Sequence, residues 1–163
     1  SDLEGYLTIL KFNHPEIPSE LSVNYASDWN MVGLPLLSDD ASYMTIFLEA
    51  IEGTLYSFQD GYIQENELIN GTGYWLRLSN SSSVTFIGGE INTLTIPLNT
   101  GWNLITGFTQ EISLGSIYDP QELIVPGTVY GFDESYVLAS TLSPGKGYWL
   151  RSSGNGEIFL SGN

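Results

Sequence analysis

The fold of this chain is decided by the heptapeptide GTGYWLR at residues 71–77, which returns as GKGYWLR at residues 145–151. The match extends beyond it: between residues 53–79 and 127–153, 13 of 27 aligned positions are identical at a constant shift of 74. Self-similarity at a fixed period is the signature of an internal repeat. We therefore interpret the chain as the product of a duplication.

A second motif precedes the heptapeptide in each copy. At a shift of 73, DWNMV at residues 28–32 falls on GWNLI at residues 101–105. We infer a leading strand and linker at residues 1–19, repeat unit 1 at 20–90 and repeat unit 2 at 91–163. The two units are expected to pack as one compact domain.

The residue pattern around these motifs predicts a mainly β fold. Short runs rich in β-branched and aromatic residues are separated by turn signals such as Asp60-Gly61 and Ser143-Pro144-Gly145, which is typical of hairpins in a sandwich or barrel. The predicted fold is thus an internally duplicated sandwich or barrel-like module of short antiparallel strands. Strands are predicted near residues 6–12, 21–25, 29–36, 54–58, 73–79, 83–88, 94–98, 101–108, 128–132, 146–152 and 157–161.

One segment departs from the β pattern. Residues 38–40, Ser-Asp-Asp, form a candidate N-cap, apolar residues follow at helical spacing, and Gly53 lies just past the end. We predict a short helix near residues 40–51. In the second unit, Gly115 and Pro120 leave room for one helical turn at most.

Composition excludes several classes of function. Lys and Arg number 4 against 19 Asp and Glu, for a formal net charge of −15 at pH 7. Four cations cannot neutralise a run of phosphates, so we expect no binding of nucleic acid. No stretch reaches the ~20 apolar residues of a membrane span, so we expect no membrane insertion. With no Cys and one His, His14, the chain offers no thiol nucleophile and no two-His metal site.

The order of the motifs resembles a known family. A Trp-Asn strand, a short helix, a hydrophobic-Tyr-x-Phe motif and a Gly-x-Gly-Tyr-Trp-hydrophobic-Arg strand are similar to the tandem "GWNLIS…GYW" repeats of secreted and cell-surface proteins of bacteria and archaea. This resemblance covers both units and implies an extracellular accessory module within a longer multidomain protein. It brings no catalytic residue to transfer. Asp28 stands where the family usually has Gly.

Alternation along the two Gly-Tyr-Trp-Leu-Arg strands indicates a candidate ligand-binding surface. Successive strand residues point to opposite faces, so each Trp shares a face with the Arg two positions later. A Trp and an Arg side by side suit cation–π stacking or a sugar-binding surface. Two tyrosines that also repeat at a shift of 74 join this set. The candidate ligand-binding residues are Trp75, Arg77, Trp149, Arg151, Tyr62 and Tyr136.

Each of these residues also has a structural interpretation. A Trp that repeats in both units, as Trp29 and Trp102 also do, is expected above all to be buried in a core, because each unit must build its own core. An Arg is expected above all to form an ion pair within the protein, because its planar guanidinium matches the geometry of a carboxylate. Both interpretations stay open beside the ligand-binding one.

Neither the acidic pairs nor His14 indicates an enzyme. Asp39-Asp40 and Asp133-Glu134 are the adjacent acids, and the second pair aligns with Gln59-Asp60, so it is not repeated. We expect no cofactor, with Ca²⁺ as the one ion that such acids could hold. His14 is expected on a surface loop rather than as a catalytic base.

These observations favour a non-catalytic extracellular or cell-surface module that binds carbohydrate or tethers a substrate. The alternative is a structural spacer or a protein–protein assembly module of a surface or secretion apparatus. The expected partner is accordingly a polysaccharide or a surface protein.

Overall fold

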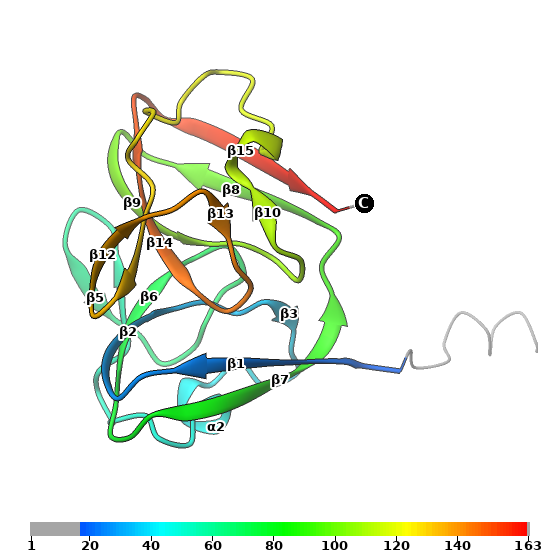
Figure 1. Cartoon of the computed structure of the whole chain (residues 1–163), viewed down its shortest axis with the longest axis vertical. Helices are drawn as coiled ribbons and strands as arrows, with labels where there is room; N and C mark the ends of the chain where they lie inside the picture. The colour runs from blue at the N-terminus through cyan, green and yellow to red at the C-terminus, as the bar shows by residue number, and fades with distance from the viewer. Residues whose placement is uncertain (1–16, 163) are drawn as a thin grey trace, which may run out of the picture.

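Short antiparallel strands make up most of the protein (Figure 1). The computed structural model describes residues 17–162, and the strand predicted at 6–12 and His14 lie outside them. The first half contains β1 (Ser19–Tyr25), β2 (Asp28–Val32), β3 (Leu36–Leu37), α2 (Tyr43–Ile46), β4 (Tyr56–Phe58), β5 (Tyr62–Gln64), β6 (Tyr74–Leu78) and β7 (Ser82–Glu90). The second half contains β8 (Thr93–Leu98), β9 (Gly101–Thr106), β10 (Ile112–Ser113), η1 (Leu114–Ser116), β11 (Tyr130–Asp133), β12 (Ser135–Leu138), β13 (Thr141–Leu142), β14 (Gly147–Ser152) and β15 (Gly156–Ser161). The predicted mainly β fold class is confirmed.

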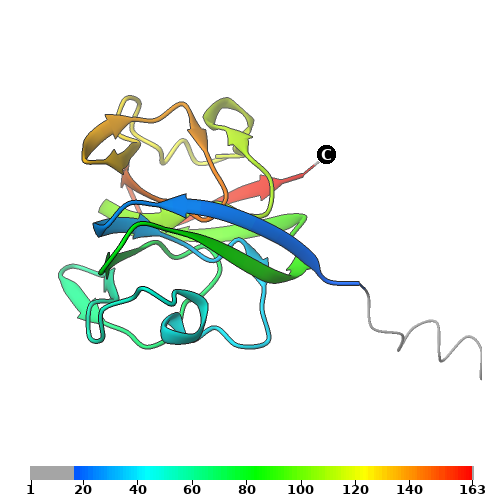
Figure 2. The same cartoon turned by 60° about the horizontal axis from the view of Figure 1, so that its bottom comes forward.

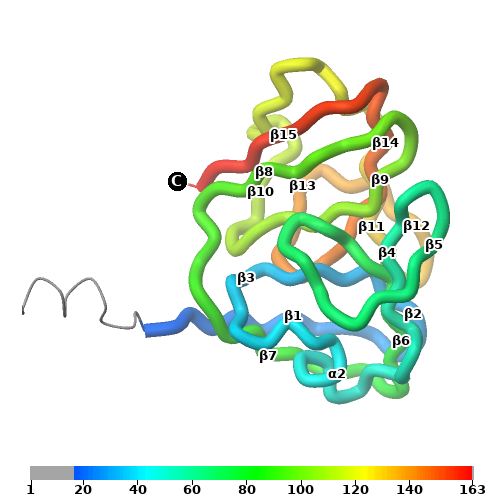
Figure 3. Tube along the Cα trace, turned by 180° about the vertical axis from the view of Figure 1, so that it is seen from behind, coloured from blue at the N-terminus to red at the C-terminus, as the bar shows by residue number. Residues whose placement is uncertain are grey.

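The two halves contain sheets of matching order. A four-stranded sheet has the order β2-β6-β4-β5 in the first half and β9-β14-β11-β12 in the second. A further sheet, β1-β7-β3, accompanies the first, while the pairs β8-β15 and β10-β13 accompany the second. Figure 2 shows the halves stacked one on the other. Figures 1 and 3 both place β5 and β12, the outer strands of the four-stranded sheets, at the same end of the molecule.

A separate hydrophobic core fills each half. In the first, Leu76 of β6 packs in one cluster with Phe47 and Phe86. In the second, Leu150 of β14 packs in another cluster with Phe108 and Ile158. The Leu of the repeated heptapeptide is fully buried in both cores. This is the burial that alternation along a half-buried strand requires.

The predicted helix is shorter than expected. Of residues 40–51, only Tyr43–Ile46 are helical. The segment after α2 makes a turn and then pairs with β6: the Ile51 N–H donates to the Arg77 carbonyl at 2.9 Å, and the Ser79 N–H donates to the Glu49 carbonyl at 2.8 Å. The bonds to the end of β6 therefore replace the helical bonds that the apolar spacing predicted. After Leu114 the chain makes one short 3₁₀ turn, as expected.

Several strand predictions also change. The strand predicted at 29–36 ends at Val32 and resumes as β3, and the one predicted at 101–108 ends at Thr106. The exposed strands β5 and β12, together with the two-residue strands β10 and β13, were not predicted. Each is too short or too exposed to show an alternating pattern.

The glycine-rich segments of the heptapeptides join the two halves. The Gly33 N–H donates to the Gly145 carbonyl at 3.1 Å, and the Thr106 N–H donates to the Gly71 carbonyl at 3.1 Å. These two bonds are equivalent, because in each a residue at the end of the Trp-Asn segment of one half donates to the first glycine of the other half's heptapeptide. Two isolated antiparallel bridges between the halves are related in the same way. An approximate twofold relation between the halves follows. Gly71 and Gly145 have φ values of +87° and +80°, a conformation that favours glycine.

A buried tyrosine strengthens the same junction. The Tyr25 hydroxyl donates to the Gly145 carbonyl at 2.5 Å, and the Lys146 Nζ lies 4.3 Å from the centre of the Tyr25 ring. Burial raises the pKa of Tyr25 far above its ordinary value. Partial burial lowers the pKa of Lys146, with Asp133 acting in the opposite direction.

We predict that this hydroxyl makes stability depend on alkaline pH. Because the pKa of Tyr25 is higher in the folded than in the unfolded chain, its contribution is complete below about pH 10 and is lost as pH rises above that value. Tyr25→Phe should cost about 1 kcal/mol at pH 8. Between pH 8 and pH 11, the advantage of the wild-type chain over this variant should fall by about 1.4 kcal/mol. Urea unfolding of both chains across this range measures it, and a constant difference would contradict the prediction.

Candidate functional site

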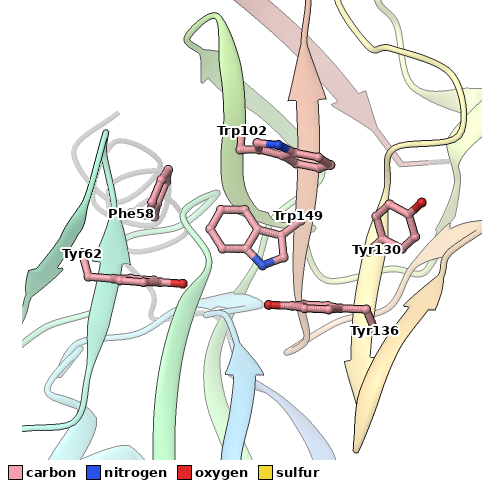
Figure 4. A pocket seen from close by; sticks show the side chains of 6 residues that line it. All are labelled: Phe58, Tyr62, Trp102, Tyr130, Tyr136 and Trp149. Carbon is pink, nitrogen blue, oxygen red and sulfur yellow. The ribbon is translucent and has the colours of Figure 1, made fainter.

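Aromatic side chains from both halves gather on one surface and line two pockets. The first pocket, about 440 Å³, is lined by six aromatic side chains and is shown in Figure 4. The second, about 430 Å³, is lined by the repeat counterparts of five of these six residues and shares Tyr62 with the first. We call them the Trp102 pocket and the Trp29 pocket, and together the aromatic face. The Trp102 pocket is lined by Phe58, Tyr62, Trp102, Tyr130, Tyr136 and Trp149, and the Trp29 pocket by Trp29, Tyr56, Tyr62, Trp75 and Phe132.

The Trp102 pocket has a buried floor and exposed walls. Trp149 is only 9% exposed, whereas Trp102, Tyr62 and Tyr136 are 44%, 58% and 55% exposed. The Trp102 ring stands nearly perpendicular to Trp149, at 6.3 Å between centroids. In Figure 4, Trp102 lies on one side of Trp149 while Tyr62 and Tyr136 lie on the other, with their hydroxyls pointing toward each other. Solvent therefore reaches the rings of the walls.

Strand register places these residues. In the first half, Trp75 of β6 lies opposite Met31 of β2 and Tyr56 of β4, and Arg77 lies opposite Trp29. All five therefore leave the same face of the sheet. In the second half the corresponding register pairs Trp149 with Leu104 and Tyr130, and Arg151 with Trp102.

Each pocket needs both halves. The Phe58 ring of the first half meets Trp149 of the second edge-on, at 5.0 Å between centroids. Reciprocally, Phe132 of the second half meets Trp75 of the first, also at 5.0 Å. Met31, Leu104 and Trp149 form a third buried cluster at this junction. The hairpins β4–β5 and β11–β12 thus complete the pocket of the other half.

The two predicted tyrosines meet where the pockets join. Burial raises the pKa of Tyr62, and the neighbouring Tyr136 raises it further, while a hydrogen bond with Trp75 acts in the opposite direction. The hydroxyls of four tyrosines and the indole N–H groups are the polar side-chain groups among the lining residues; the tyrosines are Tyr56, Tyr62, Tyr130 and Tyr136. The pockets can thus hold flat apolar surfaces and offer few hydrogen bonds.

The two arginines differ. The Arg77 Nε donates to the Asp28 Oδ1 at 2.7 Å, which is the carboxylate pairing expected from the sequence. Within residues 17–162, Arg151 has no carboxylate partner. Neither arginine lines the Trp102 pocket or the Trp29 pocket, but each lies across the strand pair from an exposed wall tryptophan.

The structure brings four of the six predicted site residues into contact with a pocket and adds others. Trp75, Trp149, Tyr62 and Tyr136 all line one. The core position expected for Trp29 and Trp102 is wrong, because they are 38% and 44% exposed and form pocket walls. Sequence reasoning also missed the residues of the repeated Tyr-x-Phe motif. These are Tyr56, Phe58, Tyr130 and Phe132. Their repetition at a shift of 74 was the signal that could have found them.

The acidic pairs form no metal-binding group in the described part of the chain. Among residues 17–162, no group of three or more His, Cys, Asp or Glu side chains is arranged to hold a metal ion. The Asp40 Oδ1 accepts a hydrogen bond from the Ser42 N–H at 2.9 Å, a local turn contact. No helix in the described part of the chain is long and apolar enough to cross a membrane.

Comparisons of this chain with protein-family models, curated proteins and solved structures find no match.

Proposed function

We propose that the protein is a non-catalytic carbohydrate-binding module whose ligand surface is the aromatic face. The observation that carries this proposal is the pair of pockets walled by accessible rings of Trp and Tyr. An aromatic ring presents a broad apolar face with its polar atom at the edge. The apolar C–H face of a sugar ring can stack on such a surface while its hydroxyls remain in water.

The two pockets imply more than one sugar contact. Their similar volumes, about 440 and 430 Å³, and their shared Tyr62 favour a ligand with several rings, such as a polysaccharide. Two contacts with one polysaccharide chain strengthen binding, since the second contact forms within a complex that the first has already made. An extracellular or cell-surface location within a longer protein belongs to the same proposal.

A second candidate function is protein–protein assembly through the strand β12. This strand is the edge of its sheet, and Tyr136, Val137 and Leu138 on it are all exposed. An exposed hydrophobic edge strand is a surface on which another chain can add a strand. Size-exclusion chromatography and binding to surface proteins test this function. Tyr136 also lines the Trp102 pocket, so a glycan bound there should compete with a partner chain on β12.

Trp102→Ala and Trp29→Ala should each weaken binding to a recognised polysaccharide by about tenfold, because a wall of one pocket is lost. Affinity electrophoresis through gels that contain soluble polysaccharides measures this retardation. Tyr118→Ala is the matched control, since Tyr118 is an exposed aromatic residue outside both pockets. Equal retardation of all three variants and the wild-type chain would argue against the aromatic face as the site.

A further inference from the structure

The two halves differ in charge at one aligned position beside the pockets. Asp28 in the first half aligns with Gly101 in the second. Asp28 binds Arg77 at 2.7 Å, so the guanidinium beside Trp29 is neutralised. Gly101 has no side chain, and the guanidinium of Arg151 has no carboxylate partner among the described residues. Among the described residues, the Arg at this aligned position therefore has a counter-ion in the first half and none in the second.

Arg151 is placed to act at the rim of the Trp102 pocket. It is exposed, and it lies directly opposite Trp102 across the antiparallel pair β14–β9. Side chains opposite each other in such a pair leave the same face with their Cβ atoms about 5 Å apart. A free guanidinium thus stands beside an aromatic wall that is 44% exposed.

We propose that the Trp102 pocket prefers a sugar that carries a carboxylate, of the uronic acid class, whereas the Trp29 pocket takes an uncharged sugar. This inference rests on the proposed function and names its ligand class. Trp102 and Trp149 stack the ring, and the Arg151 fork binds the carboxylate. Arg suits this role because its planar donors match a carboxylate bidentately.

The overall charge of −15 does not oppose this preference at short range. At physiological ionic strength, interactions between exposed charges are screened beyond about 8 Å. A direct Arg–carboxylate contact is much shorter than that distance. The free guanidinium therefore dominates at the pocket, while the remote acids mainly slow the approach of the ligand.

Gly101→Asp tests the inference by giving Arg151 the counter-ion that Arg77 already has. An Asp at position 101 would take a positive φ that side chains rarely adopt, but Asp28 already has φ +74° at the aligned position, where Gly101 has φ +95°. A Cβ at Gly101 also meets nothing within 4 Å. The probes are a short oligogalacturonate and its methyl ester, which keep the ring and differ in charge. Isothermal titration calorimetry measures both affinities.

The wild-type chain should bind the acid about tenfold more tightly than the ester, the ratio expected for one hydrogen-bonded charge pair. Gly101→Asp should abolish this preference and leave the affinity for the ester unchanged. Asp28→Gly, which frees Arg77, should create a second site that prefers the acid.

Each contrary outcome has a distinct meaning. Equal affinity of the wild-type chain for both probes, or an unchanged preference in Gly101→Asp, overturns the inference. If the ester binds, and Trp102→Ala or Trp29→Ala weakens that binding, the proposed function is still supported. Binding of neither probe overturns the inference, and the proposed function then fails only if neutral polysaccharides also show no retardation.

Discussion

Gly73→Ala is expected to lower the free energy of unfolding by about 3 kcal/mol, because the added methyl group has no room between the two halves. The Gly73 N–H donates to the Leu104 carbonyl at 3.0 Å, so the backbones of the two halves are in direct contact here. A Cβ at Gly73 would overlap the backbone carbonyl of Ile105. A carbonyl held in a strand cannot rotate away as a flexible side chain can, so β9 itself must shift.

Urea unfolding followed by far-UV circular dichroism measures this loss. Gly154→Ala is the matched control: a Cβ there would make an ordinary contact, 3.6 Å from a Leu123 methyl carbon. This control should stay within about 0.5 kcal/mol of the wild-type chain. A Gly73→Ala protein as stable as the control would mean that the two halves do not meet closely at this glycine.

Leu150→Ala should cost about 3 to 4 kcal/mol, because it removes a fully buried side chain from the core of the second half. Leu76→Ala removes the aligned side chain from the core of the first half, where Leu76 is buried to the same extent. The two variants should lose similar amounts. Both losses combine the transfer of apolar atoms to water with the cavity that a tightly packed core leaves behind.

Differential scanning calorimetry of the two variants gives the comparison, with Leu48→Ala as control. Leu48 is 88% exposed, so its truncation should change stability by no more than about 0.5 kcal/mol. A small loss in only one of the two core variants would show that this half does not depend on its own core.

The long alternating strands were the predictable part of the fold. In β6 and β14 the repeated Tyr and Leu are buried on one face, and Arg77 and Arg151 are exposed on the other. Alternation is a local property, so the sequence states it directly. The helix predicted near residues 40–51 is present but shorter than expected, for the opposite reason. Its apolar spacing is local, but bonds from residues 49–51 to the end of β6 come from a distant segment.

The candidate site was predictable only in part. Alternation placed Trp75 and Trp149 on the correct face, but it says nothing about a contact between halves. Phe58 meets Trp149 because the hairpin β4–β5 reaches across the junction, a contact between residues far apart in sequence. The different environments of Arg77 and Arg151 follow from a single aligned position, Asp28 against Gly101. The sequence showed that difference without showing its consequence.

The central claim is that the aromatic face binds the ligand, and the tryptophan side chains report on it directly. The protein has four tryptophans, and all of them line the two pockets. Indole ¹⁵N labelling therefore gives one NMR signal for each wall or floor position. Titration with soluble polysaccharides should shift the signals of Trp102 and Trp149, those of Trp29 and Trp75, or all of them. A panel in which no glycan binds, or a bound glycan that moves none of the indole signals, would contradict the account.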